Sequence, residues 1–93
     1  MRPEHVLKEA AALVDGPRAE QHGDFRLMHS RVAELWSAYL QTSIRPEQAA
    51  MCMTLLKVAR QELGKHNPDD GLDATAYTGL WASLTYGGSN ETT

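Results

Sequence analysis

The sequence predicts an all-α protein, a small bundle of about four helices, and three observations lead to that prediction. Apolar residues recur at helical spacing in four segments, residues that begin or end helices bound each segment, and none shows the sustained alternation of a strand. A chain of 93 residues forms one domain and buries only about 60 to 65% of its unfolded surface. We therefore expect a thin core that a homodimer completes.

The first two expected helices lie on either side of a polar loop. The segment PEHVLKEAAALVDG begins with Pro3 at a position that helices accept and stops at Gly16. The loop PRAEQHGDF follows, and Asp24 is well suited to cap the next helix. Between residues 25 and 40, six apolar side chains fall in one arc of the helix: Phe25, Met28, Val32, Leu35, Trp36 and Tyr39. This is the strongest amphipathic pattern in the chain.

Two further helices are expected in the second half, joined as an antiparallel hairpin. Pro46 begins the first of them, which is apolar around more than half of its circumference and ends at Gly64. The polar connection KHNPDD leads to a last helix, capped by Asn67 and carrying apolar residues as far as Leu84. A helix as apolar as the first of these belongs in the middle of a bundle.

Charge and composition argue against several classes of partner. The formal charge is -3, the pI is near 5.7 and no basic run occurs, which disfavours nucleic acid and anionic membranes. One cysteine cannot form an intramolecular disulfide, and no apolar run approaches a signal core or a membrane span. We expect a soluble, intracellular, reduced protein with a helical domain at residues 1–86 and a flexible tail at 87–93.

Four charged residues around the expected hairpin are the first candidates for a site. Lys57 and Arg60 lie one turn apart on the third helix, and Asp70 and Asp73 lie one turn apart on the fourth. Asp73 falls within the apolar arc of its helix and Asp70 at the edge of that arc. Burying a carboxylate without a partner is costly. We therefore expect Asp73 to have a cation or a metal beside it, and the obvious cations are Lys57 and Arg60.

The residues alone leave three interpretations of this charge pattern open. It is a solvated pattern, a structural ion-pair cluster that fixes the register of two helices, or part of a ligand site. A phosphate site would use the forked contacts of Arg, the point charge of Lys and the donors at the start of a helix. Two acids one turn apart could also hold Mg²⁺, although two carboxylates alone make a weak metal site.

The remaining reactive side chains show no pattern of a zinc site or of a catalytic thiol. His29 lies at the edge of an apolar face, as a core histidine satisfied by one hydrogen bond would. The other histidines, His5, His22 and His66, show no metal-ligand spacing. Cys52 has apolar neighbours and is expected to be a buried, inert thiol. The remaining large apolar side chains are expected in the core: Trp36, Met51, Met53 and Trp81.

Four stretches of the chain resemble a family of small phage and prophage proteins, a domain of unknown function. They are GPRAEQHGDF, VAELWSAYL, IRPEQAAMCMTLLKVAR and DDGLDATAY, and they match in order over nearly the whole chain. The residues that match the family's motifs are Arg18, His22, Gly23 and Asp24 in R-x-x-x-(Y/H)-G-D, Lys57 and Arg60 in L-L-K-(I/V)-A-R, and Asp70, Asp73 and Tyr77 in D-N-x-x-D-x-A-G-Y. The chain departs from the third motif in two places: Gly71 follows Asp70 where the family favours Asn, and Gly79 follows Tyr77 instead of a Gly before it.

The resemblance also links the family to the all-α MazG-like nucleoside triphosphate pyrophosphohydrolases. Those enzymes hold Mg²⁺ with an E-x-x-E pair on one helix and an E-x-x-D pair on a later one. The resemblance implies that Asp70 and Asp73 stand in for the second pair as metal ligands. The helix that should carry the first pair has Lys57 and Arg60 at that spacing instead. The acidic quartet that would activate a water molecule is therefore incomplete.

Two functions from different classes follow. The first is a MazG-like helical protein of the host cytoplasm that binds or hydrolyses nucleoside triphosphates, with no catalytic residue assigned. Its implied substrate-binding residues are Arg18, His22, Asp24, Lys57, Arg60 and Tyr77. The second is a non-catalytic phage interaction protein, which keeps the helical scaffold, uses the charges only to lock it, and binds a host protein through an exposed helical face.

Overall fold

The computed structural model describes residues 2–15 and 24–87. These ranges contain four helices and no strand: α1 (Pro3–Asp15), α3 (Phe25–Leu40), α4 (Pro46–Leu63) and α5 (Pro68–Tyr86). The predicted all-α fold with four helices is thereby confirmed. None of the helices in the described ranges is long and apolar enough to cross a membrane. Residues 17–23 of the predicted loop and residues 88–93 of the predicted tail at 87–93 lie outside the described residues.

The residue types at the helix ends explain where the helices begin. The Asp24 carboxylate accepts a hydrogen bond from the Arg26 backbone N–H at 2.8 Å and caps α3. The Asn67 side-chain oxygen accepts one from the Asp69 backbone N–H at 3.0 Å and caps α5. The prolines that begin α4 and α5 need no such partner, because proline has no backbone N–H.

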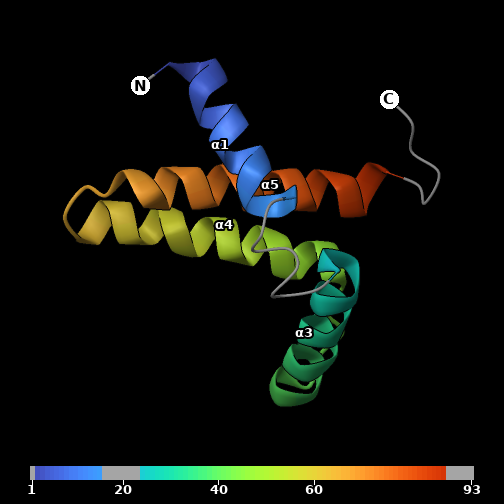
Figure 1. The fold of residues 1–93 in the computed structure, drawn as a ribbon. Coiled ribbons are helices and arrows are strands. Elements are labelled where there is room, and N and C mark those ends of the chain that lie inside the picture. Colours follow the sequence, from blue (N-terminus) through green and yellow to red (C-terminus); the bar gives the residue numbers. More distant parts are fainter. Residues whose placement is uncertain (1, 16–23, 88–93) are drawn as a thin grey trace.

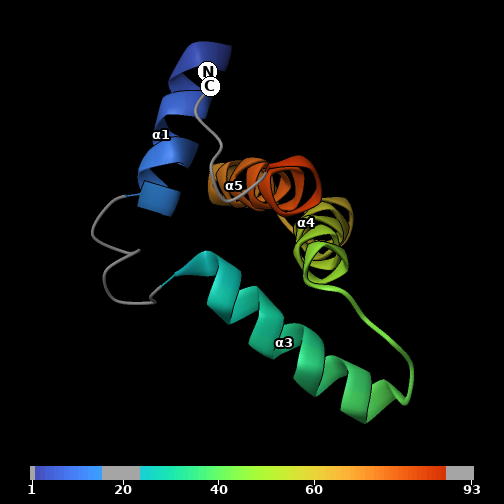
Figure 2. The same cartoon turned by 90° about the vertical axis from the view of Figure 1, so that its right-hand side faces the viewer.

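The helices are arranged around the α4–α5 hairpin. Figure 1 shows α4 and α5 side by side and antiparallel, with α1 crossing α5 and α3 meeting the hairpin near the start of α4. Figure 2 looks along the hairpin and shows α3 running steeply away from it. The C-terminal part of α3 therefore stands clear of both helices of the hairpin in either view.

The core is small and consists of small side chains. Within the described ranges no large side chain is fully buried. The buried apolar residues there are Ala10, Ala33, Ala49 and Ala50. The side chains that were expected in the core are only half-buried: Trp36, Met51, Met53 and Trp81. The fully buried part of the core therefore consists of alanines, and the large side chains of the described ranges stay partly exposed.

Two predictions about packing are wrong. Cys52 is exposed rather than buried, because the α5-facing side of α4 is the one that carries Thr54 and Lys57. In α3, half of the predicted apolar arc is exposed as well: Met28, Leu35 and Tyr39. The buried residues of α3 are His29 and Ala33, at one edge of that arc. Both α3 and α4 are therefore less buried than their composition suggested.

Candidate functional site

The α4–α5 hairpin brings the four charged residues of the sequence motifs together. Lys57 Nζ lies 3.2 Å from Asp73 Oδ2, and Arg60 Nε lies 3.7 Å from Asp70 Oδ1. An antiparallel hairpin produces this pairing, because a step toward the end of α4 is matched by a step toward the start of α5. These four residues are termed the charge cluster below. The expectation that Asp73 has a cationic partner is confirmed.

Burial within the charge cluster differs from the expected order. The Asp70 side chain is 6% exposed and that of Asp73 is 27% exposed. The reason is Gln61, whose side-chain N–H group donates to Asp70 Oδ2 at 3.1 Å and to the Asn67 backbone carbonyl at 2.7 Å. Gln61 follows Lys57 by four residues on the same face of α4. That spacing is the sequence signal that Gln61 faces α5 beside Lys57. Gln61 belongs to none of the motifs, so its contact with Asp70 was not predicted.

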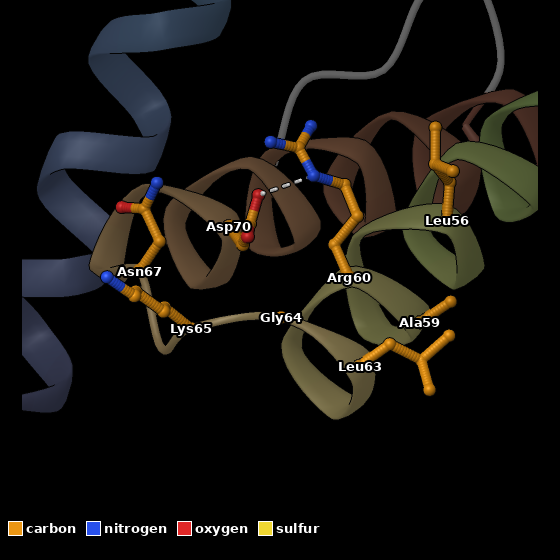
Figure 3. Close-up of a pocket in the computed structure, with 8 residues that line it drawn as sticks. All are labelled: Leu56, Ala59, Arg60, Leu63, Gly64, Lys65, Asn67 and Asp70. Atoms are coloured by element: carbon orange, nitrogen blue, oxygen red, sulfur yellow. Dashed lines mark ion pairs between the residues drawn. The ribbon is translucent and has the colours of Figure 1, made fainter.

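The two cations of the cluster are held in different ways. Lys57 is only 14% exposed, so its ammonium group is enclosed between the helices and committed to Asp73. Arg60 is 55% exposed and meets Asp70 through Nε alone, at a long distance. Figure 3 shows this ion pair at Nε, with the two terminal nitrogens of Arg60 at the end of the side chain beyond it. The forked side of the Arg60 guanidinium is therefore presented to solvent.

Arg60 stands at the edge of an open depression with a volume of about 530 Å³. The connection between the helices contributes Lys65 and Asn67 to its lining, and α5 contributes Asp70 (Figure 3). Its apolar wall consists of Leu56, Ala59 and Leu63 of α4. Lys65 was not predicted as a site residue, because it belongs to none of the motifs. The depression thus combines two exposed cations with one carboxylate that is already paired.

The carboxylates as arranged do not fit a magnesium site. Asp70 has one oxygen beside Arg60 and the other beside Gln61, while Asp73 faces Lys57. Magnesium needs oxygen ligands in open positions, and here a cation would have to be displaced first. In the parts of the chain that the structure describes, no three His, Cys, Asp or Glu side chains gather as a metal site would require. Magnesium at Asp70 and Asp73 stays a prediction, and no chemical step is derived from it.

Tyr77 of the third motif contacts α3. Its ring meets the His29 ring edge-on, with centroids 6.3 Å apart and planes at 68°. His29 is buried, and its Nδ1 lies 2.9 Å from the Phe25 carbonyl oxygen, which can only accept a hydrogen bond. The prediction of a buried histidine with one hydrogen bond is confirmed. A role of Tyr77 toward a base or sugar stays a prediction.

The first motif contributes only its last residue to the described structure. Arg18, His22 and Gly23 lie outside the described residues. Asp24 is described, and its carboxylate is engaged as the cap of α3. The implied substrate-binding roles of Arg18, His22 and Asp24 therefore stay predictions.

Comparison with known proteins places the sequence of this chain in a family. Residues 5–85 match the family model described as a domain of unknown function, DUF6378. The Gene 55 protein of Mycobacterium phage L5 is 36% identical over 76 residues, which cover 81% of this chain and 49% of that protein. The Gene 55 protein of Mycobacterium phage D29 is 33% identical over 76 residues, which cover 82% and 50%. The chain spans about half the length of these curated relatives. No solved structure matches.

The match extends over nearly the whole of the described structure, from α1 into α5. Both relatives are phage proteins, in agreement with the resemblance seen in the sequence motifs. These matches support the phage domain family, and the similarity to MazG-like enzymes stays a prediction. This chain belongs to the DUF6378 family.

Proposed function

We propose that this protein binds a nucleotide through its phosphate groups, at the depression formed by the end of α4 and its connection to α5. The observation that carries the proposal is the Arg60 guanidinium, which is 55% exposed and engaged only through Nε. A guanidinium fork matches the oxygens of a phosphate, and its contacts are charge-assisted. Arg60 therefore has unused donors of the geometry that a phosphate needs.

The surroundings of Arg60 support the same class of ligand. Lys65 lines the depression and supplies a second positive charge. The single acid there, Asp70, already has Gln61 and Arg60 beside it, so that its charge is largely offset. On the other side, Leu56, Ala59 and Leu63 form an apolar wall against which a base could lie. A phosphate group and an apolar ring would thus each meet a matching surface.

The proposal is one of binding, in the cytoplasm of a phage-infected cell, and hydrolysis is not part of it. A pyrophosphohydrolase needs metal ions that lower the pKa of an attacking water molecule. In the charge cluster, Asp70 and Asp73 face cations instead. The residues that carry the proposal are Arg60 and Lys65, whereas Lys57 holds the hairpin together.

A second candidate function is an interaction protein that binds a host protein and has no nucleotide site. The observation that favours it is that all four members of the charge cluster already have partners within the cluster. Paired charges of this kind often fix the register of two elements without a further role. The two candidates differ in whether Arg60 leaves Asp70 for a ligand.

A thermal-shift screen separates the candidates. The protein is melted with ribo- and deoxyribonucleoside triphosphates and monophosphates and with inorganic phosphate, each with and without Mg²⁺. A ligand at about 100 times its Kd adds about 2.7 kcal/mol to the free energy of unfolding, so a bound nucleotide raises the melting temperature. Arg60→Ala should weaken binding by about 10- to 100-fold.

The matched control is Arg31→Ala, which removes an exposed arginine from α3. It should leave the nucleotide shift unchanged. An unchanged melting temperature across the panel, or equal shifts in wild type and the Arg60→Ala variant, would contradict the proposal. A shift that requires Mg²⁺ and is lost on changing Asp70 would support the metal prediction instead.

A further inference from the structure

Two helices of this chain carry apolar stripes that the described structure leaves open. On α4 the stripe consists of Cys52, Leu56, Ala59 and Leu63, and all four residues are exposed. On α3 it consists of Met28, Val32, Leu35 and Tyr39, of which only Val32 is half-buried. These sets are termed the α4 stripe and the α3 stripe. Leu55, 57% exposed, lies beside the α4 stripe and widens it.

The two stripes have the same spacing along their helices. In each, successive residues are separated by four, three and four positions. This is the heptad spacing of helices that pack side by side, knobs into holes, because it keeps one apolar seam along a helix. Each stripe therefore fits another helix with a seam of the same length. The chain itself carries two such helices.

The exposed area is large enough to accommodate an interface. A folded monomer of 10.3 kDa is expected to expose about 5,400 Å², and this chain exposes 6888 Å². The difference is roughly 1,500 Å², while a standard interface buries about 800 Å² on each partner.

We propose that a second copy of this chain covers both stripes, with the α3 stripe of each copy packed against the α4 stripe of the other. A two-fold dimer uses the same surface on both subunits, so that each copy donates and receives one helix. Both contacts then form at once and close the core that one chain leaves open. A dimer of this kind also explains why no large side chain in the described ranges is fully buried in the single chain.

The dimer has a consequence for the depression beside Arg60, which rests on the proposed function. Leu56, Ala59 and Leu63 belong to the lining of that depression as well as to the α4 stripe. A helix of the second copy packed on these side chains would cover part of this wall, so that in the dimer the base would meet apolar side chains of both copies. Dissociation should therefore weaken nucleotide binding even when Arg60 and Lys65 are intact.

The first test is the mass of the wild-type protein by light scattering, over micromolar to near-millimolar concentrations. The proposal predicts twice the chain mass of 10.3 kDa, and a melting temperature that rises with protein concentration. A mass of one chain throughout, with a constant melting temperature, would overturn it. The stripes would then close within one chain or serve a different partner.

Substitutions test which surfaces form the interface. Tyr39 is 87% exposed, so Tyr39→Glu should leave the fold of one chain intact and, by placing a charge in the seam, weaken the dimer by at least about 100-fold. Leu56→Glu should do the same from the other stripe. The control is Leu27→Glu, which alters a side chain of α3 that is 73% exposed and lies off the stripe. The control should remain dimeric, and dimers of wild-type affinity in both stripe variants would refute the arrangement.

The reactivity of the Cys52 thiol reports on the interface in the wild-type protein itself, so that this test does not require a folded variant. Its thiol lies in the α4 stripe and is exposed in the single chain. The rate of its reaction with a thiol reagent should fall in the wild-type protein as concentration rises, and should stay fast in the Tyr39→Glu variant. A rate independent of concentration in a dimeric wild type would place the interface elsewhere. Since Tyr39 does not line the depression, nucleotide binding by wild type decides the proposed function separately.

Discussion

The two faces of α4 differ in chemistry and in what they contact. The face toward α5 is polar: the Thr54 and Thr78 hydroxyl oxygens lie 3.2 Å apart, Lys57 pairs with Asp73, and Gln61 donates to Asp70. The opposite face carries the apolar α4 stripe and has no partner within the described ranges. In the single chain, the hydrogen bonds and ion pairs of α4 are thus made inside the hairpin, and its apolar face stays exposed.

The two faces of α4 thus contribute differently: the polar face to the specificity of helix pairing, and the apolar face to stability. Ion pairs and hydrogen bonds between helices fix register, while their net contribution to stability is small once desolvation is included. Burial of apolar surface contributes more, at about 25 cal/mol per Å². Most of the large apolar side chains in the described ranges are only partly buried or exposed in the single chain. The hairpin sets which residues meet, and the proposed dimer would bury the apolar surface that the single chain leaves exposed.

The largest expected effect on the hairpin comes from Asp73→Ala. The change leaves the Lys57 ammonium group, only 14% exposed, without its partner. We expect a loss of about 2 to 3 kcal/mol in the free energy of unfolding, below the 3 to 5 kcal/mol of fully buried pairs because Asp73 is partly hydrated. Urea denaturation measures the loss.

The control for this change is Asp69→Ala, which lies one turn earlier in α5 and is exposed, and which should cost less than about 1 kcal/mol. Replacing both partners, Lys57→Met with Asp73→Leu, should restore most of the stability, since no charge is then stranded. Wild-type stability in the Asp73→Ala variant would show that the pair does not hold the hairpin.

Loss of a helix cap is expected to have a smaller effect. Asn67→Ala removes the acceptor for the Asp69 backbone N–H at the start of α5 and should cost about 1 kcal/mol. The contact of Gln61 persists, because it is made to the Asn67 backbone carbonyl. Asn67→Asp keeps a capping oxygen and should be near wild type in thermal denaturation. Equal losses in both variants would point to a role of the amide other than capping.

The smallest effect concerns Glu47 in the first turn of α4. A hydrogen bond from the Arg45 side chain, aided by the backbone N–H of Glu47, lowers the pKa of this carboxyl below its ordinary value of 4.5. A lowered folded-state pKa adds stability above pH 4.5, and this contribution is lost as the pH falls through the folded-state value. Arg45→Ala should raise the pKa of Glu47, measured by NMR titration of its carboxyl carbon. An unchanged pKa would mean that the side-chain contact is absent in solution.

Much of the secondary structure followed from local signals in the sequence. Asp24, Asn67 and the two helix-starting prolines act through contacts within a few residues, so their roles were predictable. The pairing of Lys57 with Asp73 was also predictable, because a short connection leaves few arrangements for two neighbouring helices.

The packing of the helices and the positions of single side chains were harder to predict from the sequence. The arc of α3 was read correctly as apolar, but periodicity does not say whether a face meets another helix of the same chain or a second copy. The exposure of Cys52 and the position of Lys65 depend on where α3 and the connection lie in space. The greater burial of Asp70 depends on Gln61, a side-chain contact that no motif recorded.

The most direct test of the account is the affinity of a nucleoside triphosphate for the wild-type protein and for the Asp70→Asn variant, by isothermal titration without added metal. Asparagine keeps an acceptor for Gln61 but removes the charge that competes with phosphate for Arg60. The account predicts binding to the wild type that becomes about 3- to 10-fold tighter in the variant, a gain of about 1 kcal/mol. Weaker binding in the variant, or no binding to either protein, would contradict it.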